Sequence, residues 1–185
     1  MFKTFILLIM MSVSFLEANV VKMNPPAEYT KGYRIIINSV ITDNVGIFDA
    51  RLYFKSSRDK FYKFFSPLTC KVDKCSGYIP ISSNTIQNID YHIVYQNGAG
   101  IIYKTKEFQT SKRDIIKLPE WQTFNREKFD IYTDMVKIPK RFYGFDDNVR
   151  IHTINNSAKI GFLSDSIDKE LLGTIDIKDI DGEFD

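Results

Sequence analysis

Hydrophobic and polar residues alternate in short segments along the first 110 residues of the chain. In the clearest segment, 47–55, the apolar residues Ala50, Leu52 and Phe54 alternate with more polar neighbours. This period of two is typical of a strand with one buried face. The residues before it, 43–46 (DNVG), favour a turn because Asp and Asn bond to nearby backbone and Gly tolerates a positive φ angle.

The same kind of pattern recurs before and after this segment. We expect strands at residues 33–38, 47–55, 62–65, 77–81, 89–96 and 101–109. Pro80 suits an edge strand because proline has no amide hydrogen for a ladder bond. The segment 97–100 (NGAG) predicts a hairpin turn. Short strands separated by turns every ~8–12 residues indicate an all-β, antiparallel sandwich.

Three stretches in this order also carry a family resemblance: GYRIIINSVITDNVGIFDARLYF, CSGYIPI and NIDYHIVYQNGAG. They resemble the immunoglobulin-like or fibronectin type III-like domains of bacterial exported proteins. The resemblance covers residues 25–110 and lies mostly in the strand patterning. It therefore implies an antiparallel sandwich fold and no particular activity.

The chain after the polar linker 110–113 (TSKR) has a different pattern. We expect strands at 129–134, 149–154 and 174–180, and one helical turn at 167–172. No internal repeat of the first half is visible. We favour a second, smaller β-rich unit over residues 114–185, and the alternative is a set of strands added to the sandwich.

The first 18 residues have the features of a secretory signal peptide. Lys3 is followed by the apolar run 5–16, and Ala18 suits the position before a cleavage site. A membrane-spanning helix needs about 20 consecutive apolar residues, and Glu17 ends this run too early. We therefore expect export to the periplasm, the cell surface or the medium, and no membrane span after cleavage.

The chain has two cysteines, Cys70 and Cys75. In an oxidising compartment, such a pair at short spacing predicts a disulfide, here one that closes a local hairpin or loop. A redox pair usually has two intervening residues, and a zinc site needs two further ligands. We favour the structural disulfide over both.

Charge and motifs exclude several classes of function. A net charge of +2 is too small to indicate a nucleic-acid partner. The sequence contains no nucleophile elbow, no zinc-protease motif and no glycine-rich phosphate loop. His92 and His152 lie in separate predicted strands, and the neighbouring carboxylates of Asp146 and Asp147 do not face each other in a regular strand or turn. We therefore expect no enzyme, no catalytic residue and no cofactor.

Two acidic segments are candidates for calcium sites. In the tail 176–185 (DIKDIDGEFD), placing Gly182 at the glycine of an EF-hand loop puts Ile177 where the first Asp is needed. Asp43 and Asp49, with Asn44, lie where some sandwich modules bind calcium, but they are equally ordinary turn and strand-edge residues. We favour the ordinary turn and expect no metal.

One loop and one aromatic residue remain as a candidate ligand surface. The stretch KSSRDKFYKFF interleaves cations with aromatics, as surfaces that bind anionic polysaccharides or lipid headgroups do. The candidate residues are Lys55, Arg58, Lys60, Tyr62, Lys63 and Trp121. We favour a solvated loop for the stretch, and Trp121 is either a sugar-stacking platform or a side chain packed between the two parts of the chain.

These observations predict a non-enzymatic exported binding or interaction protein of the cell envelope, built on an immunoglobulin-like sandwich. Its expected partner is another envelope protein or a polysaccharide. The alternative function is a carbohydrate-binding module, which needs exposed aromatic rings. A hydrolytic enzyme is a third class and needs a polar cleft with a general base.

Overall fold

The computed structural model describes residues 20–114, 117–125, 127–133, 142, 144–154 and 177–180. Every regular element among these residues is a β-strand, so the all-β prediction is confirmed. No helix long and apolar enough to cross a membrane is found in this part of the chain. The predicted signal peptide (1–18) and the predicted helical turn (167–172) lie outside the described residues.

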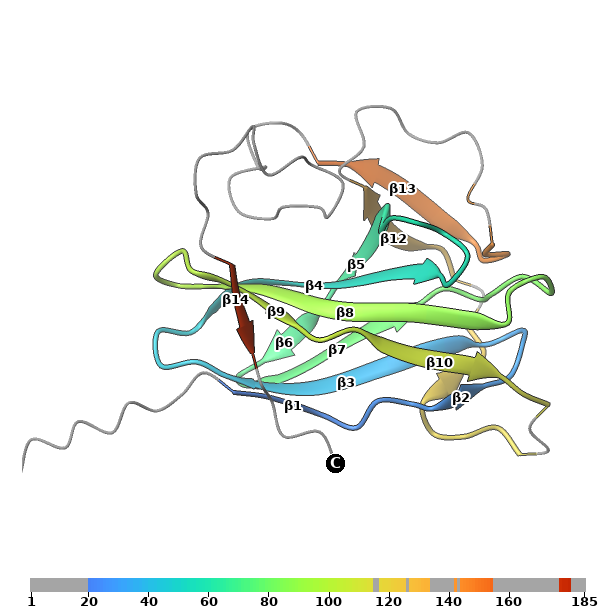
Figure 1. The fold of residues 1–185 in the computed structure, drawn as a ribbon, viewed down its shortest axis with the longest axis horizontal. Coiled ribbons are helices and arrows are strands. Elements are labelled where there is room, and N and C mark those ends of the chain that lie inside the picture. Colours follow the sequence, from blue (N-terminus) through green and yellow to red (C-terminus); the bar gives the residue numbers. More distant parts are fainter. Residues whose placement is uncertain are drawn as a thin grey trace, which may run out of the picture.

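The smaller of two sheets is antiparallel throughout (Figure 1). Its strands, in spatial order, are β1 (Val20–Met23), β3 (Arg34–Thr42), β7 (Lys74–Ile79) and β6 (Thr69–Lys71). The short strand β11 (Gln122–Thr123) pairs with the beginning of β3, on residues that β1 does not reach. We call this sheet the first sheet.

The second sheet is larger and mainly antiparallel. Its strands follow the order β13 (Val149–Thr153), β12 (Phe129–Thr133), β5 (Phe64–Pro67), β4 (Ile47–Ser56), β8 (Asn88–Asn97), β10 (Phe108–Lys112) and β2 (Glu28–Tyr29). Two further strands, β9 (Ile102–Thr105) and β14 (Ile177–Ile180), continue from β8. Three pairs are parallel: β10 with β2, β12 with β13, and β14 with β9.

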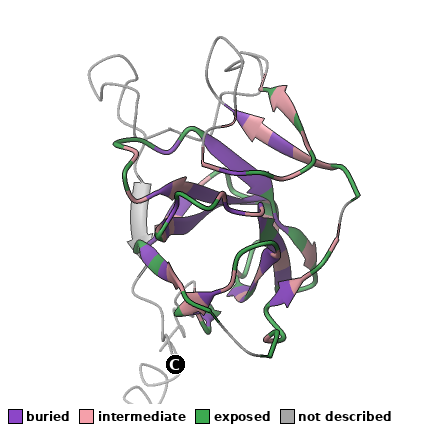
Figure 2. Cartoon of the chain, turned by 90° about the vertical axis from the view of Figure 1, so that its right-hand side faces the viewer, coloured by how far each residue is buried: buried purple, intermediate pink, exposed green. Residues whose placement is uncertain are grey.

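The two sheets share one hydrophobic core. It contains apolar residues from both inner faces, among them Ile35, Ile37 and Ile79 of the first sheet and Leu52, Phe54, Tyr91 and Ile93 of the second. Figure 2 shows buried positions along the strands of both sheets. The alternation predicted for residues 47–55 is thus confirmed for the face that carries the apolar residues.

The outer face of the second sheet is buried as well. Tyr53 and His92 lie opposite each other on β4 and β8, and their rings stack at 5.3 Å. Tyr62 packs edge-on against His92 at 4.3 Å, and Phe65 lies 5.0 Å from Tyr53. The three rings of Tyr53, Tyr62 and Phe65 form a second hydrophobic cluster with Val94 and Ile102, and His92 packs against it. The sequence pattern assigned Tyr53 to the polar side of its strand, and the structure buries it.

The strands after residue 114 are added to the edges or ends of the two sheets that the earlier strands form. β11 adds to β3, and β12 pairs with β5 through Tyr132 and Phe65. This is the arrangement expected of strands added to a shared fold. The division of the chain at 110–114 into two folding units stays a prediction, because strand pairing does not show whether either part folds alone.

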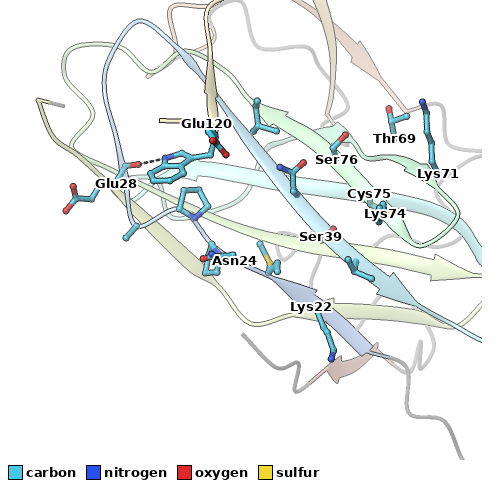
Figure 3. Close-up of a pocket in the computed structure, with 18 residues that line it drawn as sticks. Lys22, Asn24, Glu28, Ser39, Thr69, Lys71, Lys74, Cys75, Ser76 and Glu120 are labelled. Atoms are coloured by element: carbon cyan, nitrogen blue, oxygen red, sulfur yellow. Dashed lines mark hydrogen bonds between the residues drawn. The ribbon is translucent and has the colours of Figure 1, made fainter. Parts of the chain in front are cut away.

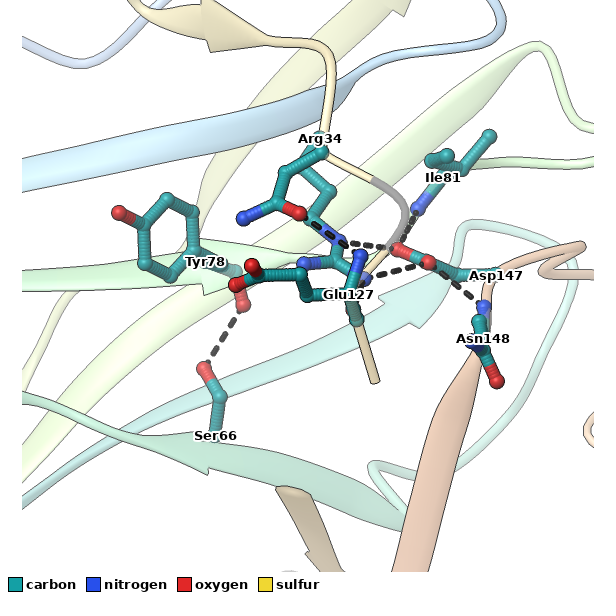
Figure 4. A network of polar contacts seen from close by, with 8 residues as sticks. Arg34, Ser66, Tyr78, Ile81, Glu127, Asp147 and Asn148 are labelled. Carbon is teal, nitrogen blue, oxygen red and sulfur yellow. Dashed lines mark hydrogen bonds and ion pairs between the residues drawn. The ribbon is translucent and has the colours of Figure 1, made fainter. Parts of the chain in front are cut away.

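A buried ion pair connects β3 to the loop before β13. Arg34 donates two hydrogen bonds to Asp147, at 2.7 and 2.8 Å, and both side chains are almost completely buried (Figure 4). Asp147 also accepts bonds from the backbone amides of Ile81 and Asn148. The guanidinium lies 4.2 Å above the ring of Phe129. Asp147 is therefore a structural carboxylate with every oxygen engaged.

The predicted disulfide is confirmed. Cys70 and Cys75 are directly opposite each other on β6 and β7, and their sulfurs are bonded. The hairpin turn between them places Val72 at a φ angle of 59°. The bond thus closes a local hairpin at the edge of the first sheet, as the spacing of the cysteines predicted.

Candidate functional site: a basic groove on the first sheet

A groove of about 1230 Å³ lies over the outer face of the first sheet (Figure 3). Its floor is formed by residues of β1, β3, β7 and β6, and its wall by the segment 24–28 together with Glu120 and Trp121. Pro25 and Pro26 keep this segment extended because their rings fix φ. We call this feature the basic groove, for the reason given next.

Three lysines lie on one line across the floor. Lys22 is directly opposite Val40, Val40 opposite Lys74, and Lys74 opposite Lys71, so the line crosses β1, β3, β7 and β6. Residues directly opposite in a sheet lie on the same face. All three lysines are exposed. They form a basic row that the sequence does not reveal, because Lys22 joins the others only through the strand order.

A second row beside the first carries polar, uncharged side chains. Asn38 lies opposite Ser76, and Ser76 opposite Thr69. These side chains offer one amide and two hydroxyl groups, which both donate and accept hydrogen bonds. The floor therefore combines a row of cations with a row of groups suited to hydroxyl-rich ligands.

The basic row is an unfavourable arrangement for the protein alone. Lys71 and Lys74 are paired directly, and like charges in this position destabilise a sheet. Within the part of the chain that the structure describes, no carboxylate forms an ion pair with either lysine. Glu28, on the groove wall, is paired with Arg113 at 2.8 Å. An anionic ligand lying on the row would relieve this repulsion.

Trp121 is held in place at the wall. Its indole Nε1 donates a hydrogen bond to the carbonyl oxygen of Glu28 at 3.0 Å, drawn as a dashed line in Figure 3. Its own carbonyl accepts a bond from the amide of Ile36 at 2.7 Å. The side chain nevertheless remains 39% exposed. A fixed, partly exposed ring on a groove wall has the geometry of a stacking surface.

The structure separates the other predicted ligand residues from Trp121. None of Lys55, Arg58, Lys60, Tyr62 and Lys63 lines the basic groove. Tyr62 is buried in the outer cluster of the second sheet, and Lys55 binds Asp90 at 3.2 Å with its ammonium 5.0 Å from the ring of Tyr62. Only Arg58, Lys60 and Lys63 are exposed. The loop presents cations but not Tyr62.

The two histidines have different environments and lie on different strands. Burial, followed by the nearby charges of Lys104 and Lys55, lowers the pKa of His92 well below its ordinary value. Its Nδ1 has no hydrogen-bond partner among the described residues. His92 is thus a neutral packing residue that solvent does not reach.

His152 is on β13, where its Nε2 lies 2.8 Å from Asp130. Arg150 also binds Asp130, and the bonds from His152 and Arg150 lower the pKa of this carboxyl. This exposed pair is separate from the basic groove. The pair resembles a surface ion pair more than a catalytic dyad, because no nucleophilic side chain is bonded to the ring in the described structure.

The carboxylates in and after the acidic turn before β4 already have bonding partners within the protein. The carboxylate of Asp43 accepts a bond from the amide of Val45 and one from the side-chain amide of Asn97 at 3.2 Å, and its backbone carbonyl accepts a bond from the amide of Gly46. Asp49 binds Arg51. Among the described residues, no three His, Cys, Asp or Glu side chains gather as a metal site would require.

The chemistry of the basic groove is therefore ionic attraction, hydrogen bonding and ring stacking. No family model matches the chain, and no curated protein matches its sequence. The functional argument consequently rests on the geometry of the groove.

Proposed function

We propose that this chain is an exported, non-enzymatic binding protein of the cell envelope, an immunoglobulin-like sandwich that holds its ligand in the basic groove. The observation that carries the proposal is the row of Lys22, Lys74 and Lys71 across four strands, in the same groove as Trp121 on the wall. The row crosses β3 at Val40, and Trp121 is bonded to β3 at Ile36, four residues away. Because these groups lie on a sheet, binding does not require a loop to become ordered, and this favours higher affinity. The signal-peptide pattern of residues 1–18 supports the location.

A carbohydrate-binding role is favoured by a specific feature of the same groove. The amide of Asn38 and the hydroxyls of Ser76 and Thr69 suit sugar hydroxyls, and the face of Trp121 suits the apolar face of a sugar ring. The lysine row suits carboxylate or phosphate groups along the same polymer. The second candidate is thus a module that binds an acidic polysaccharide.

Binding to polysaccharides of different charge tests these roles. Residues 19–185, retaining every described strand, are measured by affinity electrophoresis in gels containing polygalacturonate or neutral dextran. We expect retardation by the acidic polymer only. Lys71→Glu with Lys74→Glu should abolish it, and Trp121→Ala should weaken it about tenfold, the ~1–2 kcal/mol typical of a stacked ring.

Lys60→Glu with Lys63→Glu is the matched control, because it changes net charge equally on an exposed loop outside the groove. If both double variants lost retardation by the acidic polymer equally, the attraction would be nonspecific and the groove would not be the binding site. Capture of an envelope protein that depends on Lys71 and Lys74, without polysaccharide retardation, would support the first candidate over the second.

A further inference from the structure

Three loops meet at one end of the molecule. They are the β3–β4 turn, the β6–β7 turn and the β8–β9 turn, on the left of Figure 1. The amide of Ile41 binds the carbonyl of Asp73 at 2.8 Å, which holds the β6–β7 turn against the end of β3. The amide of Gly98 binds the carbonyl of Gly46 at 2.9 Å, which joins the other two turns. We call this region the loop end.

The loop end presents apolar side chains to solvent. Val72 is 95% exposed, Phe48 78% and Val45 56%, and the first two are the most exposed large hydrophobic residues in the described structure. Phe48 lies at a β-bulge between β4 and β8, an irregularity that redirects a side chain. Val72 has a positive φ, which is unfavourable for a β-branched residue. Each of these two positions combines a local irregularity with an exposed apolar group.

Cations accompany the apolar groups. Lys71 and Lys74 lie on either side of the β6–β7 turn, next to Val72. Of the carboxylates at the loop end, Asp43 is bonded by Asn97 and Asp49 by Arg51. A third, Asp73, lies in the β6–β7 turn between Val72 and Lys74. Apolar groups bordered by lysines are the combination that binds the interface of an anionic bilayer.

The chain enters the fold at this same end. Val20, the first residue of β1, is paired with Thr42, the last residue of β3. Residues 1–19 therefore join the described structure next to the β3–β4 turn, and they include the apolar run 5–16. A segment of this composition partitions into lipid. Until the predicted cleavage after Ala18, this attachment keeps the loop end close to the membrane that the apolar run enters.

We propose that the loop end docks on the surface of an anionic lipid bilayer. Phe48, Val72 and Val45 enter the boundary between headgroups and acyl chains, and Lys71 and Lys74 contact lipid phosphates. This surface overlaps the basic groove at the two lysines, but its apolar residues lie outside the groove and it needs no ligand there.

Vesicle co-sedimentation tests the proposal. The chain 19–185 lacks the apolar run but retains all described strands. We expect it to sediment with phosphatidylglycerol-containing vesicles and not with pure phosphatidylcholine, and to be released by salt. Phe48→Ser with Val72→Ser should weaken binding about tenfold or more, since each buried apolar side chain contributes substantially. Phe124→Ser, at a residue 58% exposed next to β11, is the control.

Fluorescence locates the contact. Trp121 is the only tryptophan, so a Trp121→Phe chain carrying Phe48→Trp reports the loop end alone. Its emission should shift to the blue on anionic vesicles and be quenched by brominated lipid. Absence of vesicle binding, or equal loss with Phe124→Ser, would overturn the proposal, as would capture of a protein partner through Phe48 without vesicle binding. Trp121→Ala should bind vesicles like the parent chain while binding the polysaccharide more weakly. The proposal for the groove and the proposal for the loop end can therefore be refuted independently.

Discussion

The outer faces of the two sheets differ in a way that their sequences conceal. On the first sheet, the outer face is exposed and carries Lys22, Asn38 and Lys74. On the second, it is buried and carries Tyr53 and His92 in a cluster of aromatic rings. Antiparallel sheets commonly expose one face to water, and only the first sheet does so here. The exposed face is therefore where binding chemistry is sought, and the buried one is a second core.

The largest expected effect comes from the ion pair that links β3 to the loop before β13. Arg34→Met leaves Asp147 buried without its cation and should lower the free energy of unfolding by about 3–5 kcal/mol. Chemical denaturation monitored by circular dichroism measures this change. Arg34→Met with Asp147→Leu should recover part of the loss, because no charge is then buried alone. A loss below about 1 kcal/mol for the single variant would show that the pair does not stabilise the fold.

Substitution on the two outer faces tests the comparison directly. Tyr53→Ala removes a buried ring from the second sheet and should cost about 3 kcal/mol. Lys74→Ala removes an exposed lysine opposite Lys71 and should change stability by no more than about 0.5 kcal/mol. Urea unfolding of both variants under the same conditions gives the two values. Similar values would mean that the outer faces are not different in burial.

The disulfide at the edge of the first sheet should contribute a smaller amount. Cys70→Ser with Cys75→Ser removes a loop constraint of only six residues, worth about 2 kcal/mol in the chain-entropy model. The variant should fold and lose that amount of stability. Reduction of the parent chain provides the matched measurement, and a fully unfolded reduced protein would contradict a merely local role.

The smallest effect depends on pH. Because the pKa of His92 is lowered in the folded state, the unfolded chain takes up a proton near pH ~6.5 while the folded chain stays neutral. Stability is therefore complete above that pH and falls as the pH drops below it, by at most about 1.4 kcal/mol per pH unit. His92→Phe should flatten this dependence between about pH 6.5 and 5. His152→Gln should retain it, since His92 is still present.

The strands of the inner core could be predicted because their sequences alternate and are rich in β-branched residues. Residues 33–38 and 47–55 were found in this way and became β3 and β4. Strands β2 and β11 have two residues each, too few for a periodic pattern, and pair through distant parts of the chain. Such strands were not predicted.

Of the residues predicted to form a ligand surface, only Trp121 lies in the candidate site. Lys22, Lys71 and Lys74 come together through the order β1, β3, β7, β6, which depends on the packing of the whole chain. The lysines around the two cysteines were the available signal, because alternation places Lys71 and Lys74 on one face of a hairpin. The burial of Tyr62 and the partial burial of Lys55 could not be predicted, since amphipathic side chains look alike in buried and exposed segments.

The hydrogen bond from the amide of Ile36 to the carbonyl of Trp121 has a consequence for the order of folding. A chain that emerges from a ribosome or a translocation channel with its N-terminus first presents β3 long before Trp121 and β11. Until they arrive, the beginning of β3 is an unpaired edge rich in isoleucine, which invites pairing with other chains. The same late event covers this edge and completes the wall of the groove, so the site that we propose for binding forms only when this edge is paired.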